Sequence, residues 1–129
     1  MPTVHDATIQ VRVRYAECDP MRVAHHSAYA VWLEIARTEL LRQGGVSYRQ
    51  LEAAGVMIVV ARLSIRFRRP ALYDDLLDIH THLQPIHGVK IEHHYRIMRG
   101  SDLIADAQTT VVCVDAQGKL QPVPALLQS

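Results

Sequence analysis

The chain has 129 residues and a formal net charge of +1, and 49% of its residues are apolar. This length is typical of one domain, and the apolar content is sufficient for a core that needs no disulfides. The near-zero charge disfavours a protein that binds nucleic acid by neutralising phosphates. Its two cysteines, Cys18 and Cys113, lack metal-ligand spacing. We therefore expect free thiols in a reducing compartment.

The sequence contains no candidate for a membrane span. Its longest apolar stretch, about residues 55–61, is too short to cross a bilayer. Residues 1–6 contain no apolar run of the kind found in secretory signals. We therefore expect a cytoplasmic protein that folds as a single domain over residues 1–129.

The first regular pattern in the chain is an alternation with a period of two residues. It predicts a strand with one buried face, formed by Ile9, Val11, Val13 and Tyr15. A turn-like stretch follows at residues 17–22.

The next pattern has the spacing of a helix. An apolar stripe with the period of an amphipathic helix is formed by Tyr29, Leu33, Ala36 and Leu40. The helix is predicted over about residues 27–43. Gly44 and Gly45 end it, because glycine tolerates the left-handed geometry that follows a helix.

Two further features accompany this helix. Glu34 and Arg37, three residues apart, are expected to form an ion pair on its wetter side. A second short helix is predicted over residues 47–54, with Ser47 as its cap and Gly55 as its end.

Strands make up the rest of the chain. Each shows alternating or continuous apolar residues and is bounded by turn residues such as Pro70 or Gly100. They are predicted at residues 57–67, 77–83, 90–99 and 103–114. The last is apolar on both faces near its end, as a central strand would be. The tail from Pro122 is expected to form a loose cap.

The order of elements predicts the fold class. Short turns between successive strands indicate antiparallel pairing. One long helix must bury its apolar stripe on one face of the sheet. The predicted fold is therefore α+β, a curved antiparallel sheet of about five strands wrapped around one long helix. This arrangement is the hotdog fold.

Three segments of the sequence resemble the 4-hydroxybenzoyl-CoA thioesterase family. They are VRYAECDPMRVAHHSAY at residues 13–29, WLEIARTELL at residues 32–41 and FRRPALYDD at residues 67–75. The resemblance extends over about residues 9–114. It implies hydrolysis of an acyl-CoA to free acid and CoA, without a dissociable cofactor. It also implies a dimer or tetramer whose active site lies between subunits.

The resemblance also implies roles for individual residues. Asp19 stands where the family has its catalytic carboxylate, which acts as a nucleophile or as a general base for water. The family's carbonyl-polarising backbone N–H corresponds to His26. A strand that borders the acyl pocket in the family corresponds to the segment with Val60, Ala61 and Arg62. The sequence departs from the family at Arg22, where the family often has glycine.

Elementary chemistry is consistent with this pairing of Asp19 and the helix start. Thioester hydrolysis passes through a tetrahedral oxyanion. A helix N-terminus offers unpaired N–H groups and a partial positive charge to such an anion. Asp19 lies seven residues before His26, so a short loop can place its carboxylate opposite the same carbonyl. An aspartate before proline is otherwise a common turn former, which is the competing interpretation of Asp19.

Other residues have two interpretations each. Arg62, Arg66, Arg68 and Arg69 form either a solvated strand face or, with Lys90, a site for the phosphates of CoA. Tyr15 and Tyr29 are expected in the core first and as pocket lining second. Glu34 is a rival catalytic carboxylate on the helix. The eight histidines lack zinc-ligand spacing, so no metal site is expected.

Two other functions remain open at the level of sequence. One is hydration or dehydration of an acyl thioester, for which the sequence lacks the His-Phe-Pro stretch of such hotdog enzymes. The other is non-catalytic binding of acyl-CoA. No motif indicates whether the acyl group is aromatic, short or long.

Overall fold

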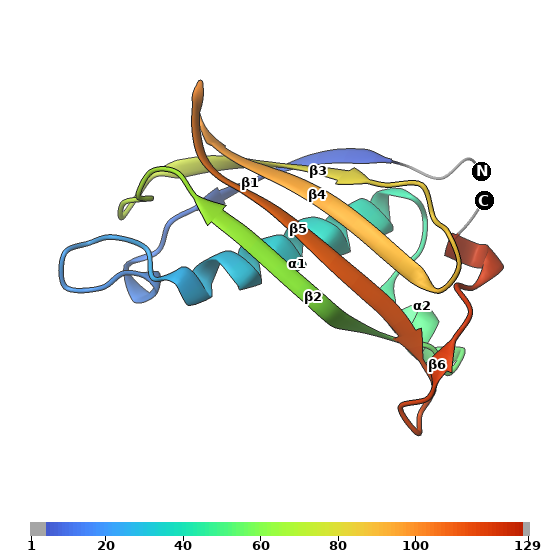
Figure 1. Cartoon of the computed structure of the whole chain (residues 1–129). Coiled ribbons are helices and arrows are strands. Elements are labelled where there is room, and N and C mark those ends of the chain that lie inside the picture. Colours follow the sequence, from blue (N-terminus) through green and yellow to red (C-terminus); the bar gives the residue numbers. More distant parts are fainter. Residues whose placement is uncertain (1–4, 128–129) are drawn as a thin grey trace.

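The structure, a computed structural model, describes residues 5–127 and has the hotdog fold. Figure 1 shows one long helix lying against one face of a single sheet. The elements in chain order are β1 (Asp6–Arg12), the 3₁₀ turn η1 (Tyr15–Glu17), α1 (His26–Gln43), α2 (Tyr48–Ala53), β2 (Met57–Phe67), β3 (Leu76–Leu83), β4 (Lys90–Arg99), β5 (Asp102–Val114), β6 (Leu120–Gln121) and the 3₁₀ turn η2 (Ala125–Leu127).

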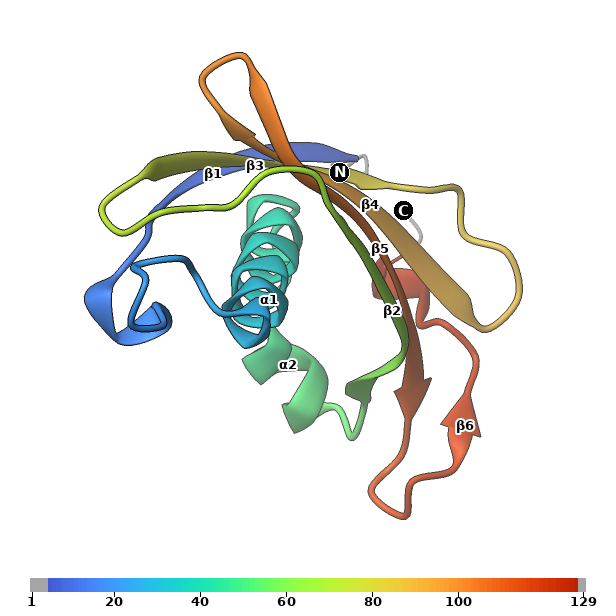
Figure 2. The same ribbon diagram turned by 60° about the vertical axis from the view of Figure 1, so that its left-hand side comes forward.

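The sheet has the order β1-β3-β4-β5-β2, with the two-residue strand β6 paired to β5. Every pairing is antiparallel. Successive strands pair as expected from β3 to β5, but the expectation is wrong for β2 and β3, which lie apart in the sheet. The connection over residues 68–75 is long enough to cross the end of the sheet. Figure 2 shows the sheet curving around α1.

Helix α1 provides one half of the main core. Trp32, Leu33 and Ala36 are at most 2% exposed. They pack against the inner face of the sheet, where Leu77 and Ile97 are fully buried. Each large apolar side chain removed from water contributes roughly 1.5–3 kcal/mol, so this stripe fixes the helix on the sheet.

The predicted helix ends are confirmed. Gly44 is the C-cap of α1, and Gly45 follows with a φ of 87°. Ser47 caps α2 by accepting a hydrogen bond from the N–H of Gln50, whose side chain accepts in return from the N–H of Ser47. This reciprocal capping box fixes the start of α2.

Two predictions about side-chain positions are wrong. Tyr15 is 71% exposed, because β1 ends at Arg12 and Tyr15 begins the turn η1. Arg37 is only 8% exposed and does not pair with the exposed Glu34. It lies four residues after Leu33, on the buried stripe, where phenolic groups accept its hydrogen bonds.

The tail is also better packed than a loose cap. Leu127 in η2 is 8% exposed and belongs to a second core cluster with Leu40 and Leu51. This cluster lies at the C-terminal end of α1, beside α2. Within residues 5–127, no helix combines the length and apolar character that a membrane crossing requires.

Strand β2 is an edge strand with exposed apolar side chains on both faces. Val60 is 51% exposed and Phe67 is 53% exposed, and Met57, Val59 and Leu63 are similarly open. Apolar side chains on both faces of β2 are therefore left open to solvent. An open apolar edge of this kind is a ready template for another strand.

Candidate active site

Asp19 lies in the tight loop between η1 and α1. Its Oδ1 accepts hydrogen bonds from the backbone N–H groups of Met21 (2.9 Å) and Val23 (3.2 Å). Its carbonyl accepts from the N–H of Arg22 (2.9 Å), which closes the expected turn. Within residues 5–127, Oδ2 has no hydrogen-bond partner, and the residue is exposed. The carboxylate is thus held by one oxygen and offers the other.

Arg22 adopts the left-handed backbone conformation, with a φ of 65°. This is the region in which glycine is favoured and other residues are strained. Arg22 is held there by its neighbours: its carbonyl accepts a hydrogen bond from the N–H of Tyr73 (2.9 Å), and Val23 forms a β-bridge with Leu72. Arginine in place of glycine therefore still gives a tight turn after Asp19.

The N-terminus of α1 presents a free backbone donor at His26. The imidazole Nδ1 of the N-cap, His25, accepts from the N–H of Ser27 (3.2 Å), and the carbonyl of His25 accepts from Ala28 (3.0 Å). The N–H of His26 has no partner in the described part of the chain. With the helix dipole behind it, this N–H is suited to an oxyanion.

Glu17, which the sequence did not indicate, ties the Asp19 loop to α1. Its side chain is 8% exposed and accepts hydrogen bonds from the indole Nε1 of Trp32 (2.8 Å) and the N–H of Arg14 (2.8 Å). Burial opposes ionisation, but these hydrogen bonds keep the pKa of Glu17 below its usual value. Its carbonyl also accepts from the N–H of His25, directly before the helix.

A groove runs beside the N-terminus of α1, with a volume of about 350 Å³. It is lined by Val23, Ala24, His26, Tyr29, Phe67, Arg68, Arg69 and Pro70. Tyr29 is 2% exposed, and its ring contacts the ring of Phe67 edge-on at 4.8 Å. Burial raises the pKa of the Tyr29 phenol. Tyr29 is therefore both a core residue and part of the wall next to His26.

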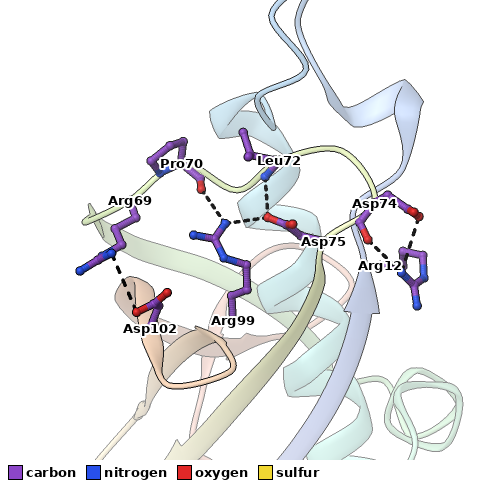
Figure 3. Close-up of polar contacts among 8 residues, drawn as sticks. All are labelled: Arg12, Arg69, Pro70, Leu72, Asp74, Asp75, Arg99 and Asp102. Atoms are coloured by element: carbon purple, nitrogen blue, oxygen red, sulfur yellow. Dashed lines mark hydrogen bonds and ion pairs between the residues drawn. The ribbon is translucent and has the colours of Figure 1, made fainter.

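The connection between β2 and β3 forms the second wall of the groove, and ion pairs fix it (Figure 3). Asp75 accepts hydrogen bonds from the N–H of Leu72 (2.9 Å) and the guanidinium of Arg99 (2.7 Å). Arg99 also donates to the carbonyl of Pro70 (3.2 Å). The N–H of Ala24 then donates to Ala71 (2.8 Å), which joins this connection to the Asp19 loop.

Of the predicted site residues, His26 and Tyr29 line the groove, and Asp19 and the others do not. Val60, Ala61 and Arg62 lie around a β-bulge in the middle of β2, away from the end that borders the groove. Lys90 lies level with Val59, two strands further into the sheet. Tyr15 lies on the surface in the turn η1, four residues before Asp19. The centre of its ring is 5.5 Å from the centre of the Tyr73 ring.

Two of the four arginines in the predicted cluster form ion pairs within the chain. Arg68 donates to Asp106 (2.8 Å), and Arg69 lies 3.9 Å from Asp102. Among residues 5–127, Arg62 and Arg66 form no ion pair. The same residues contain no group of three or more histidine, cysteine or acidic side chains that could hold a metal ion.

The site thus combines a fixed carboxylate that presents a free oxygen with an unpaired N–H at a helix start. These are the two groups that acyl-transfer chemistry to water requires. The family assignment rests on sequence: the chain matches the thioesterase-like superfamily over residues 13–129. It belongs to this superfamily.

Relatives of the chain carry consistent names. The acyl-CoA thioester hydrolase YbgC of Escherichia coli O6:H1 is 36% identical over 106 residues, which are 81% of this chain and 79% of YbgC. The long-chain acyl-CoA thioesterase FadM of E. coli K12 is 31% identical over 108 residues, 82% of this chain and 81% of FadM.

A solved structure gives the same result for the fold. The probable thioesterase from Bartonella henselae matches with a TM-score of 0.87 and 29% identity. The match covers 92% of this chain and 99% of that one.

Proposed function

We propose that this superfamily member is an acyl-CoA thioesterase that hydrolyses an acyl-CoA to a free acid and CoA. Two observations carry the proposal: a free carboxylate oxygen on Asp19 and a free N–H on His26, within the described residues and at the two ends of one loop. The names of YbgC and FadM support the same reaction.

In the proposed reaction, the thioester carbonyl oxygen accepts a hydrogen bond from the N–H of His26. Asp19 either attacks the carbonyl carbon directly or takes a proton from the water that attacks it. Negative charge develops on the carbonyl oxygen and is stabilised at the helix start. Collapse of the tetrahedral intermediate breaks the C–S bond. If water attacks, the proton held by Asp19 passes to the CoA thiolate and the free acid leaves directly. If Asp19 attacks, the thiolate takes a proton from solvent, and water then hydrolyses the acyl-Asp19 anhydride to the free acid.

We further propose that two copies of the chain pair through β2. The exposed apolar edge supports this, because the unpaired backbone N–H and C=O groups of a long edge strand favour pairing with another strand. Antiparallel pairing about the middle of β2 would put Val60 of a second copy opposite Ser64 and Met57 opposite Phe67. The first half of each β2 would then border the groove of the other copy.

This arrangement gives the predicted substrate residues a role across the interface. Val60 and Ala61 of a second copy would border the acyl group, and Arg62 and Lys90 would face the phosphates of CoA. Arg62→Ala is expected to raise KM with little change in kcat, as added salt should do. An unchanged KM would mean that Arg62 is a solvated surface residue that does not bind CoA.

The reaction itself is tested by release of free thiol from a panel of short, long and aromatic acyl-CoAs. A thioesterase produces CoA and free acid. A non-catalytic binder would show affinity without thiol release, and a hydratase or dehydratase would change the acyl chain and leave the thioester intact.

We also propose that the enzyme is cytoplasmic, because the free thiols Cys18 and Cys113 would remain reduced there. Cell fractionation tests this proposal.

A further inference from the structure

A second cavity lies at the opposite end of α1 from Asp19. It is bounded by the C-terminal half of α1, by α2, by the ends of the strands and by η2. Most of its lining is apolar, including Leu40, Val46, Ile58, Leu83, Ile91 and Val111. Its volume is about 70 Å³. The packed core around Trp32 and Leu33 fills the space between this cavity and the groove at His26.

One charged side chain, Arg37, enters this apolar lining. It is 8% exposed, and it donates to the phenolic oxygens of Tyr48 and Tyr95, each at 3.3 Å. No carboxylate within residues 5–127 pairs with it. Burying a cation without an anion is costly, and two long hydrogen bonds to neutral groups do not offset that cost.

His93 lines the same cavity and leaves a second polar group unsatisfied. The residue is 6% exposed, and its Nδ1 is buried without a hydrogen-bond partner among the described residues. Its ring stacks on the ring of Tyr95 at 6.1 Å. Burial, with the nearby charges of Arg37 and His94, lowers the pKa of His93 to about 3. The imidazole is therefore neutral at pH 7, and Arg37 is the sole cation lining the described cavity.

We propose that this cavity is a binding site for a short aliphatic monocarboxylate, with the carboxylate on Arg37 and the carbon chain against the apolar wall. A guanidinium matches a carboxylate with two parallel hydrogen bonds. One cation in an apolar cavity suits one negative charge. A water molecule needs roughly 10–15 Å³ by the same measure, so the cavity accommodates about five to seven non-hydrogen atoms, as in butanoate.

The site is distinct from the hydrolytic groove and does not depend on the proposed function. Arg37 lies eleven residues after His26, which corresponds to about 16 Å along the helix. Its ligand would enter beside η2 and α2, whereas the thioester would lie at the other end of α1.

Titration of the full-length protein with butanoate at pH 7, followed by calorimetry, tests the proposal. Saturable binding of one butanoate per chain is expected, with far weaker binding of butanamide, which has the same size and no charge, and of inorganic phosphate. Arg37→Met should weaken butanoate binding at least about tenfold. Arg42→Met, an exposed position on the same helix, and Asp19→Asn should both leave it unchanged.

A second measurement uses the unaltered protein and so does not depend on how Arg37→Met folds. Butanoate should shift the imidazole resonances of His93, and leave those of the exposed His26 in place. The proposal is overturned if butanoate does not bind, if butanamide or phosphate binds equally well, or if Asp19→Asn removes the binding. It is also overturned if the resonances of His26 shift and those of His93 do not.

Discussion

The carbonyl of Arg22 accepts a 2.9 Å hydrogen bond from the N–H of Tyr73, and Arg22 does so with a φ of 65°. The connection between β2 and β3 therefore holds the Asp19 loop in a conformation that its own sequence disfavours. Strain at Arg22 is maintained by the surrounding structure, and it fixes the loop that carries Asp19, the proposed catalytic residue.

Replacement of Arg22 tests this interpretation. Arg22→Gly should change the free energy of unfolding by less than about 1 kcal/mol, because relief of strain offsets the greater freedom of the unfolded chain. Arg22→Val should lower it by roughly 1–2 kcal/mol and reduce kcat, because a β-branched residue resists a positive φ. Met21→Val, at the neighbouring position that is 80% exposed, is the control and should have little effect. Urea denaturation that gives equal values for the glycine and valine variants would refute the account.

The open edge of β2 predicts that the protein is an oligomer. Sedimentation at micromolar concentration should show a dimer or a larger species. Leu63→Lys places a charge among the exposed apolar residues of β2 and should shift the protein to monomer, with loss of thiol release. Gln10→Lys places the same charge on β1, the opposite edge strand, and should leave the assembly intact. A fully active wild-type monomer would contradict the proposed inter-subunit site.

The lowered pKa of the buried His93 predicts how the stability of the fold depends on pH. The pKa of His93 is lowered from 6.5 to about 3, so the unfolded chain binds a proton below about pH 6.5 and the folded chain does not. Stability therefore falls as the pH decreases from about 6.5 towards 3. From pH 7 to pH 5 the loss due to His93 is about 2 kcal/mol.

The comparison is between the wild-type chain and His93→Asn, which cannot titrate. Arg37 on α1, Tyr48 on α2 and His94 and Tyr95 on the same strand are the titratable or charged groups around His93, and all remain in the variant. Denaturation at the two pH values should show a smaller loss for the variant. Equal losses in both proteins would mean that His93 is not buried in its neutral form.

Periodicity and turn chemistry were enough to predict much of this fold. The stripe that includes Leu33, the glycine end of α1 and the Ser47 cap are local signals, and each has the predicted structure. Strand pairing is not a local property. The sequence therefore did not indicate that β2 leaves β3 and pairs with β5 at the edge.

The candidate site was predictable in part. Asp19 and His26 lie close in sequence, and the structure has the expected turn at Asp19 and begins α1 at His26. Glu17 and Arg37 were missed because charged residues usually face water. Their burial depends on partners far along the chain, Trp32 for Glu17 and Tyr95 for Arg37. No spacing rule reveals such a partner.

The role of Asp19 is the central claim, and kcat of Asp19→Asn tests it most directly. The asparagine keeps the size of the side chain and an oxygen that can accept from Met21 and Val23, but it can neither attack the carbonyl nor take a proton from water. With the best acyl-CoA of the panel, kcat should fall by about 10²–10⁴ while KM changes little. Glu34→Gln, which changes an exposed carboxylate on α1, should retain most of the activity. Near wild-type kcat in Asp19→Asn together with a loss in Glu34→Gln would contradict the account and make the acid on the helix the catalyst.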